Sequence, residues 1–166
     1  MLSLMSLLGK LSLGLIVGFG GLGSSLGVGA AGTAAAGGWA KEGKEGKPLS
    51  GKYVALVAMP VSQTLYCMIL FILMEPYAKI PENGPVLLGI AIGAGLCELF
   101  SAYVQGVIGG AGVRCLAENG GKGFGNLVVA MGVAESIGLF ALVTGILVLN
   151  SNIMIKAAEV AGAVAP

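Results

Sequence analysis

Long apolar stretches alternate with short polar ones along this chain, and each apolar stretch has the length of a membrane-spanning helix. Crossing a bilayer of about 30 Å takes roughly 20 apolar residues in a helix. We expect such helices at approximately 11–38, 52–74, 85–113 and 126–150. The connections between them are rich in charged and turn-forming residues: KEGKEGKPLSGK, EPYAKIPENGP and AENGGKGFGN. The pattern therefore predicts an all-α integral membrane protein with four helices.

The composition supports the same class of protein. Of the 166 residues, 56% are hydrophobic and only 10% are charged, whereas soluble domains carry roughly 25% charged residues. A formal net charge of +1 without a basic face argues against nucleic-acid binding. The chain has no histidine, and its three cysteines lack metal-type spacing. We therefore expect the cysteines to be packing residues and predict no transition-metal site.

The distribution of lysine and arginine predicts the orientation in the membrane. Basic residues gather at the first and third connections, whereas the middle connection holds only Lys79. By the positive-inside rule, the first and third connections are cytoplasmic and both termini lie outside. The first apolar stretch has some features of a signal peptide, but it is long and no basic residue precedes Lys10. We expect it to remain as a membrane span.

The two halves of the chain are related by an ungapped repeat. A shift of 74 residues places GKYVALVAMPVSQTLYCMILFIL, from Gly51, on GNLVVAMGVAESIGLFALVTGIL, from Gly125. The same shift aligns the first span with the third, so one register serves both spans of each half. We predict a duplicated two-helix hairpin, with repeats at 1–80 and 81–166. Because each repeat has two spans, both repeats have the same orientation and are related by an axis along the membrane normal.

Glycine is concentrated in the first and third spans, which predicts close helix packing. Small residues at helical spacing let two helix backbones approach each other. We expect these two spans to form the inner wall of a ring of several copies, with the second and fourth spans outside. Ordinary close packing within a monomer is the alternative.

A single charged residue, Glu135, lies in the fourth span, VVAMGVAESIGLFALVTGILVLN. A carboxylate at the bilayer centre costs at least about 2.5 kcal/mol on insertion scales. Under the repeat, Glu135 falls opposite Val61, so each pair of hairpins has one such acid. Acidic residues inside membranes are functional by default, and we predict that Glu135 is functional.

The second span contains the polar run SQTLY inside an apolar helix. Met59, Ser62, Gln63 and Tyr66 stand at i, i+3, i+4 and i+7, which is one helix face. Pro60 lacks an N–H, so we expect a distorted helix just before this polar run.

Together with Gln105 of the third span and Glu135 of the fourth, this polar face offers hard oxygen ligands, which suit hard cations. One negative charge means that a monovalent cation leaves the site neutral, whereas a divalent cation does not. The alternative is that these residues hydrogen-bond the helices together, which we favour for Ser62 and Thr64 taken alone.

The duplicated hairpin and the segments PVSQTLY, SAYVQG and VAESIGLF resemble the proteolipid of V-type ATPases, the K or c component of the membrane rotor. The sodium-pumping bacterial kind matches best, over nearly the whole chain up to about Asn150. The resemblance implies a four-helix subunit that assembles into a homo-oligomeric rotor ring in lipid and does not itself hydrolyse ATP. It also implies a stator subunit with an arginine facing Glu135, and central-stalk subunits as partners.

In the sodium-binding members of that family, a glutamate, two glutamines, a hydroxyl residue and a backbone carbonyl hold Na+. Carried over by position, the ligands are Glu135, Gln63, Gln105, Ser62 and the backbone carbonyl of Met59. The family's tyrosine that hydrogen-bonds the glutamate falls on Tyr66. The hydroxyl residue is serine here, where threonine is expected, and the hydroxyl ligand survives that change.

Glu98 of the third span fits this ligand set less easily. It precedes Gln105 by seven residues, about 10 Å along the helix axis and on nearly the same face. Three roles are open: it lines an ion path, it is a carboxyl kept neutral by burial, or it extends to the interface or the ring lumen. We favour a role other than a ligand.

Other interpretations of the whole chain stay open. A proton-driven rotor proteolipid would use the same glutamate without sodium. A small secondary transporter or channel would explain the acid, but not a parallel repeat that lacks the carboxylate in one half. A structural proteolipid without transport is a further alternative.

Overall fold

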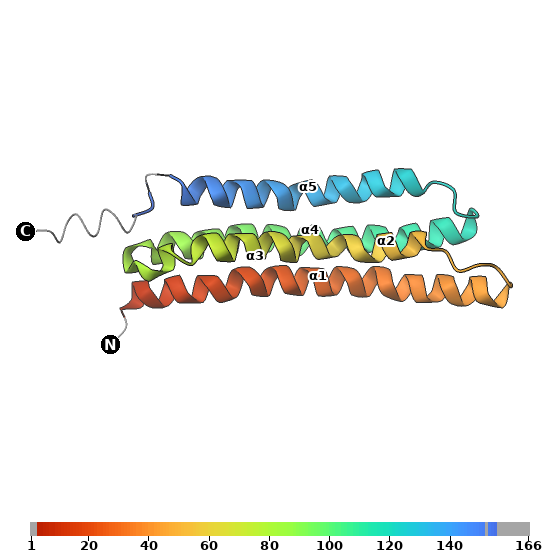
Figure 1. Ribbon diagram of the computed structural model, residues 1–166, viewed down its shortest axis with the longest axis horizontal. Coiled ribbons are helices and arrows are strands. Elements are labelled where there is room, and N and C mark those ends of the chain that lie inside the picture. The colour runs from red at the N-terminus through yellow and green to blue at the C-terminus, as the bar shows by residue number, and fades with distance from the viewer. Residues whose placement is uncertain (1–2, 152, 156–166) are drawn as a thin grey trace, which may run out of the picture.

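The computed structural model describes residues 3–151 and 153–155 and shows a bundle of long helices packed side by side (Figure 1). In chain order the elements are α1 (Leu4–Lys44), α2 (Lys52–Ala58), η1 (Met59–Val61), α3 (Ser62–Met74), η2 (Tyr77–Lys79), η3 (Pro81–Asn83), α4 (Gly84–Glu118) and α5 (Phe124–Leu149). Within the described residues, 4 helical stretches are long and apolar enough to cross a membrane. The predicted all-α fold with four membrane-spanning helices is confirmed.

The first and third spans are longer than the apolar pattern predicts. α1 starts at Leu4 and ends at Lys44, and α4 continues to Glu118. Backbone hydrogen bonding carries each helix beyond its apolar part. At the start of α1, the Ser6 N–H donates to the Ser3 hydroxyl oxygen at 3.2 Å, a helix cap. At its other end, Lys41 and Lys44 lie in the last turn, where positive charge is favourable to the helix dipole.

The second span is interrupted at Pro60, as its missing N–H predicts. Residues Met59–Val61 form a 3-10 turn between α2 and α3. Here the Ser62 N–H donates to the Met59 carbonyl, three residues back, instead of four. The turn therefore lies directly before the polar run of α3.

α4 lies at the centre of the bundle and contacts the other three spans. Its most extensive contact is with α1, where glycines bring the two backbones together. A Cβ atom on Gly106 would overlap the backbone of Gly27, and one on Gly27 would overlap the Ala102 carbonyl. Figure 1 shows α5 on the side of α4 away from α1. The glycine-rich spans thus pack on each other as expected, and the ring of several copies stays a prediction.

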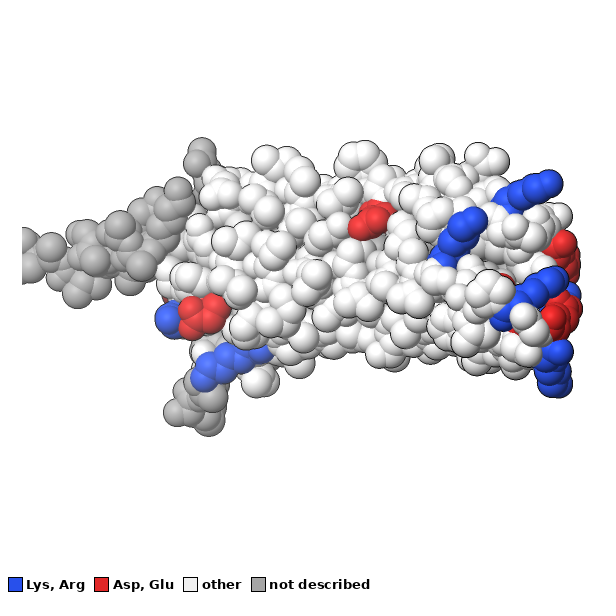
Figure 2. Space-filling model, turned by 45° about the vertical axis from the view of Figure 1, so that its right-hand side comes forward, with Lys and Arg blue, Asp and Glu red and all other residues white. Residues whose placement is uncertain are grey.

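The connections alternate between the two ends of the bundle. The α1–α2 and α4–α5 connections lie at one end (Figure 1). There the Lys52 ammonium donates to the Gly121 carbonyl at 2.8 Å. At the other end, the side chain of Asn83 makes two hydrogen bonds of 2.9 Å with the backbone of Ile155. On the face shown in Figure 2, most basic side chains lie toward the end with the α1–α2 and α4–α5 connections, and one acidic patch lies midway along the bundle.

The outer surface of α5 is strongly apolar. Large side chains such as Phe140, which is 70% exposed, point away from the bundle along the helix. An apolar surface of this extent is a liability in water and is suited to lipid or to another apolar surface. The length and the apolar surface of these helices are those of a multi-pass membrane protein.

Candidate ion-binding site

The predicted ligands lie together near the middle of the bundle, where α3, α4 and α5 meet. Ser62 and Gln63 begin α3, Gln105 comes from α4, and Glu135 comes from α5. A continuous set of hydrogen bonds joins these four side chains. Residues separated by many positions in the sequence thus form one polar network inside an apolar bundle.

Three oxygens, including that of the Ser62 hydroxyl, lie together at the start of α3. The Oγ atom of Ser62 lies 3.0 Å from the Met59 carbonyl oxygen, to which it donates, and 3.2 Å from Oε1 of Gln63. The Met59 carbonyl belongs to the 3-10 turn at Pro60, directly before the polar run. A hydroxyl, an amide carbonyl and a backbone carbonyl therefore stand together as neutral donors for a cation.

The two glutamines are fully buried, and their amide groups are held from several sides. Nε2 of Gln63 donates to the Ser101 hydroxyl at 3.0 Å and to Oε1 of Gln105 at 3.3 Å. Nε2 of Gln105 donates to the Met131 carbonyl at 3.1 Å and to Oε2 of Glu135 at 3.4 Å. Both hydrogens of each amide have partners, so the position of each carbonyl oxygen is fixed as well.

Glu135 is half-buried, and both of its oxygens accept hydrogen bonds. The Tyr66 hydroxyl donates to Oε1 at 2.8 Å, and Gln105 donates to Oε2. The resemblance to rotor proteolipids implies this tyrosine–glutamate bond, and the structure contains it. Glu135 is therefore a carboxylate with neutral donors around it and no cationic side chain bonded to it among the described residues.

Ser101 is a member of the network that the sequence analysis did not single out. It is buried, its hydroxyl donates to the Ala134 carbonyl at 2.8 Å, and it accepts the bond from Gln63. Ser101 thereby ties α3, α4 and α5 to each other. The available signal was its spacing, since it precedes Gln105 by four residues and shares its helix face.

Thr64 lies outside the network, as the sequence analysis favours. Its hydroxyl oxygen is 2.7 Å from the Ser24 hydroxyl oxygen and 3.1 Å from the Gly20 carbonyl oxygen, both on α1. Thr64 therefore links α3 to α1 and faces away from Glu135.

Glu98 is fully buried, and neither of its carboxylate oxygens has a hydrogen-bond partner among the described residues. Its burial excludes the alternative in which it extends to the interface or into a lumen. Glu98 also makes no hydrogen bond to the network of the predicted ligands.

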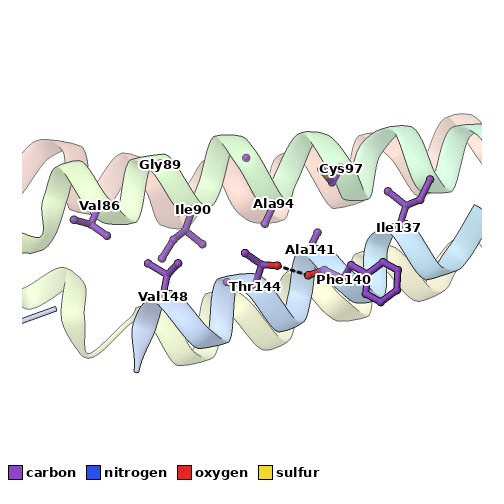
Figure 3. Close-up of a pocket in the computed structure, with 12 residues that line it drawn as sticks. Val86, Gly89, Ile90, Ala94, Cys97, Ile137, Phe140, Ala141, Thr144 and Val148 are labelled. Carbon is purple, nitrogen blue, oxygen red and sulfur yellow. Dashed lines mark hydrogen bonds between the residues drawn. The ribbon is translucent and has the colours of Figure 1, made fainter. Parts of the chain in front are cut away.

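A groove of about 670 Å³ runs between α4 and α5 (Figure 3). Its wall is apolar, with Val86, Ile90, Ile137 and Val148 among the lining residues, and none of the lining residues described belongs to the polar network. The Thr144 hydroxyl in this groove donates to the Phe140 carbonyl of its own helix at 2.7 Å. The polar chemistry of this bundle is therefore in the network and not in the groove.

Comparison with known families finds one match. The model of a family described as the ATP synthase C subunit matches residues 11–74 and 88–148, which together make up more than half of the chain. The first matched segment covers most of α1 and the whole of α2 and α3, and the second covers most of α4 and α5. The two hairpins of the chain are therefore two copies of one family unit. No match is found among curated proteins.

Proposed function

This chain belongs to the ATP synthase C-subunit family, and on that premise we propose that it is the rotor proteolipid of a V-type ATPase that carries Na+ across the membrane at Glu135. Family membership gives the coarser statement: the chain is a ring-forming, ion-translocating rotor subunit that works with other components of a rotary ATPase. The V-type assignment and the choice of Na+ are our proposals.

The observation that carries the proposal is the network around Glu135. Its oxygens come from a hydroxyl, two amides, a backbone carbonyl and one carboxylate. These are hard donors, and the single negative charge matches a monovalent cation. The proposed ligands are Glu135, Gln63, Gln105, Ser62 and the carbonyl of Met59, with Tyr66 holding the carboxylate.

The buried glutamines favour sodium over the proton as the transported ion. A proton needs only the carboxylate of Glu135, whereas a sodium ion needs several oxygens in place of its water shell. Gln63 and Gln105 are both fully buried, and hydrogen bonds hold their amides in place, so two carbonyl oxygens are available to replace water around a cation. A proton-driven rotor is the second candidate, because the Tyr66–Glu135 pair alone would serve it.

The position of the site explains how rotation and transport would be coupled. A bare carboxylate facing hydrocarbon is costly, so a rotor site could enter lipid only when a cation neutralises Glu135. At the stator, an arginine would take the place of the cation and release it. The ring would then move in lipid only when its sites are loaded.

The repeat supports the V-type assignment. Val61 occupies the place of Glu135 in the first hairpin, so a subunit of two hairpins carries one ion site. We further propose that the end with the α1–α2 and α4–α5 connections faces the cytoplasm and contacts the central stalk, because basic residues gather there.

Sodium protection of Glu135 against a carbodiimide tests the proposal. Carbodiimides react with the protonated carboxyl, and sodium in the site competes with the proton. We expect sodium to slow labelling of the purified ring and more sodium to be needed as the pH falls. Potassium at the same ionic strength is the control, and Glu135→Gln identifies the labelled residue. If Glu135 is labelled but sodium gives no protection at any pH, the proton-driven rotor replaces the sodium rotor.

A further inference from the structure

Glu98 is the one acidic side chain of the described bundle that is completely buried, with an exposed fraction of 0%. Both of its oxygens lack a hydrogen-bond partner among the described residues. An unpaired carboxylate in an apolar interior is costly, and binding a proton removes the largest part of that cost, the burial of the charge. Glu135 of α5 acts electrostatically on Glu98, and Glu98 in turn acts on Tyr66 and Cys67 of α3; none of these three groups is a cation.

The space for this carboxyl is provided by Gly138 of α5. A Cβ atom at Gly138 would overlap Oε2 of Glu98 and would lie 3.3 Å from the Ser101 hydroxyl oxygen. The carboxyl of Glu98 and the hydroxyl of Ser101 therefore face the same glycine. Glu98 therefore lies beside Ser101, which is not one of the proposed ligands.

The first hairpin shows what the same two positions do without an acid. The shift of 74 residues places Ser24 on Glu98 and Thr64 on Gly138. In the first hairpin these residues form a direct contact, with 2.7 Å between the two hydroxyl oxygens. In the second hairpin, Glu98 has a longer side chain than Ser24, and Gly138 has no side chain where the first hairpin has Thr64. The long acid is thus matched by a glycine across the helix contact, which indicates a position adapted to a carboxyl.

Ser101 has room for one more hydrogen bond. Its single hydrogen goes to the Ala134 carbonyl, and one of its two lone pairs accepts from Nε2 of Gln63. The second lone pair is available to an additional donor. A protonated carboxyl supplies one O–H donor and no charge.

We propose that Glu98 permanently holds a proton. We further propose that its side chain, which makes no hydrogen bond to Ser101 in the structure, turns in the space beside Gly138 and donates to the Ser101 hydroxyl, which in turn holds the Gln63 amide. Glu98 is then a positioning residue: it acts on the candidate ion site through Ser101 and does not touch the ion. Its own protonation is independent of the function proposed above, whereas its effect on sodium binding rests on that function.

Infrared spectroscopy tests the protonation without any need for sodium. In purified rings of Glu135→Gln at neutral pH, we expect the band of a protonated carboxyl, and we expect it to vanish in the double variant Glu98→Gln/Glu135→Gln. Adding Ser101→Ala to Glu135→Gln should shift the band, because the carboxyl loses its acceptor. Absence of the band from Glu135→Gln would overturn the proposal, and an unshifted band in the Ser101→Ala variant would overturn the contact with Ser101.

Sodium affinity tests the positioning role. Glutamine is neutral and retains a donor, so Glu98→Gln should bind sodium within about twofold of the unchanged ring. Glu98→Met fills similar space without a donor and should bind about five- to tenfold more weakly, the effect of one lost hydrogen bond. If Glu98→Met binds sodium as tightly as the unchanged ring, Glu98 only fills space. If Glu98→Gln loses sodium binding, the charge of Glu98 is needed. If the unchanged ring binds no sodium, the proposed function fails and the infrared result still decides the state of Glu98.

Discussion

The hydroxyl of Tyr66 donates a 2.8 Å hydrogen bond to Oε1 of Glu135, so the acid of α5 is held in place by a side chain of α3. The other oxygen of Glu135 faces Gln105 of α4. Three spans thereby determine where one carboxylate lies. An ion site built in this way depends on the packing of the second hairpin against α3, and each contact can be removed separately.

Tyr66→Phe removes one O–H and leaves the ring of the side chain in place. A hydrogen bond to a charged group contributes about 1.5–3 kcal/mol, and partial exposure of Glu135 reduces this, so we expect roughly tenfold weaker sodium binding. Assembly of the ring should be unchanged. Tyr103→Phe is the matched control, because Tyr103 of α4 is 42% exposed and lies outside the network. If Tyr66→Phe and Tyr103→Phe change the sodium affinity equally, the hydroxyl of Tyr66 does not contribute to ion binding.

Glu135→Gln should abolish ion-coupled rotation while the ring still assembles. Glutamine has nearly the same shape, but it cannot neutralise a cation or pair with a cationic stator residue. Membrane insertion should become easier, since a charge in the bilayer is lost. ATP-driven ion uptake by vesicles with the whole enzyme is the measurement, and Glu82→Gln in the α3–α4 connection is the control. Normal transport by Glu135→Gln would remove the basis of the proposed function.

Gln63→Leu and Gln105→Leu should each weaken sodium binding, while Glu135 keeps its ability to bind a proton. Each change removes an oxygen ligand, and in Gln63→Leu the Ser101 hydroxyl also loses its donor. With hydrogen-bond-sized losses of about 1–3 kcal/mol, the affinity should fall roughly tenfold or more. Equilibrium uptake of sodium by the purified ring measures it. Thr64→Val, which faces α1, should leave the affinity unchanged; if all three variants bind alike, the glutamines are packing residues.

The sequence predicted those parts of the site that repeat along one helix or match a family pattern. Ser62 and Gln63 stood out because polar residues at helical spacing are rare in an apolar span. Ser101 was missed, since its partner in α5 is the carbonyl of Ala134, and a backbone group leaves no trace in a sequence pattern. The sequence could not choose burial of Glu98 from the three open roles, because that burial depends on Gly138, a residue of another helix.

The ends of the helices show the same limit. Hydrophobicity marks the part of α1 that suits lipid, whereas the helix itself runs from Leu4 to Lys44, between its caps Ser3 and Glu45. Pro60 is different, because the missing N–H acts on the local backbone whatever the surroundings. Local chemistry was therefore predictable, and contacts between distant segments were predictable only where a family pattern implies them, as for Tyr66 and Glu135.

Gly106→Ala should destabilise the contact of α1 with α4. A Cβ atom there would overlap the backbone of Gly27, and backbone cannot move aside as a flexible side chain does. Overpacking of this kind costs about 1–3 kcal/mol, so the thermal unfolding temperature of the detergent-solubilised protein should fall. Gly132→Ala is the control, because nothing lies within 4 Å of that Cβ position. An unchanged unfolding temperature in Gly106→Ala would show that α1 and α4 pack less closely than described.

The side chain of Asn83 joins the α3–α4 connection to the segment after α5. Its Nδ2 donates to the Ile155 carbonyl and its Oδ1 accepts from the Ile155 N–H, both at 2.9 Å, so the amide copies the pairing of two backbone strands. Asn83 is almost completely buried, and water cannot replace these bonds easily. Asn83→Ala should therefore cost about 1–3 kcal/mol, the sum of two ordinary hydrogen bonds.

Hydrogen exchange at the Ile155 amide measures that loss directly. We expect exchange at this amide to become roughly ten- to hundredfold faster in Asn83→Ala, because a local opening that costs less is populated more often. Asn83→Asp should lie between the two, since a carboxylate still accepts from the Ile155 N–H but cannot donate to its carbonyl. Asn119→Ala is the control, because Asn119 is exposed and its side-chain amide donates to the Cys115 sulfur of its own helix end, at 3.4 Å. If exchange at Ile155 is the same in Asn83→Ala and Asn119→Ala, the segment after α5 is held by other contacts, such as the buried side chain of Met154.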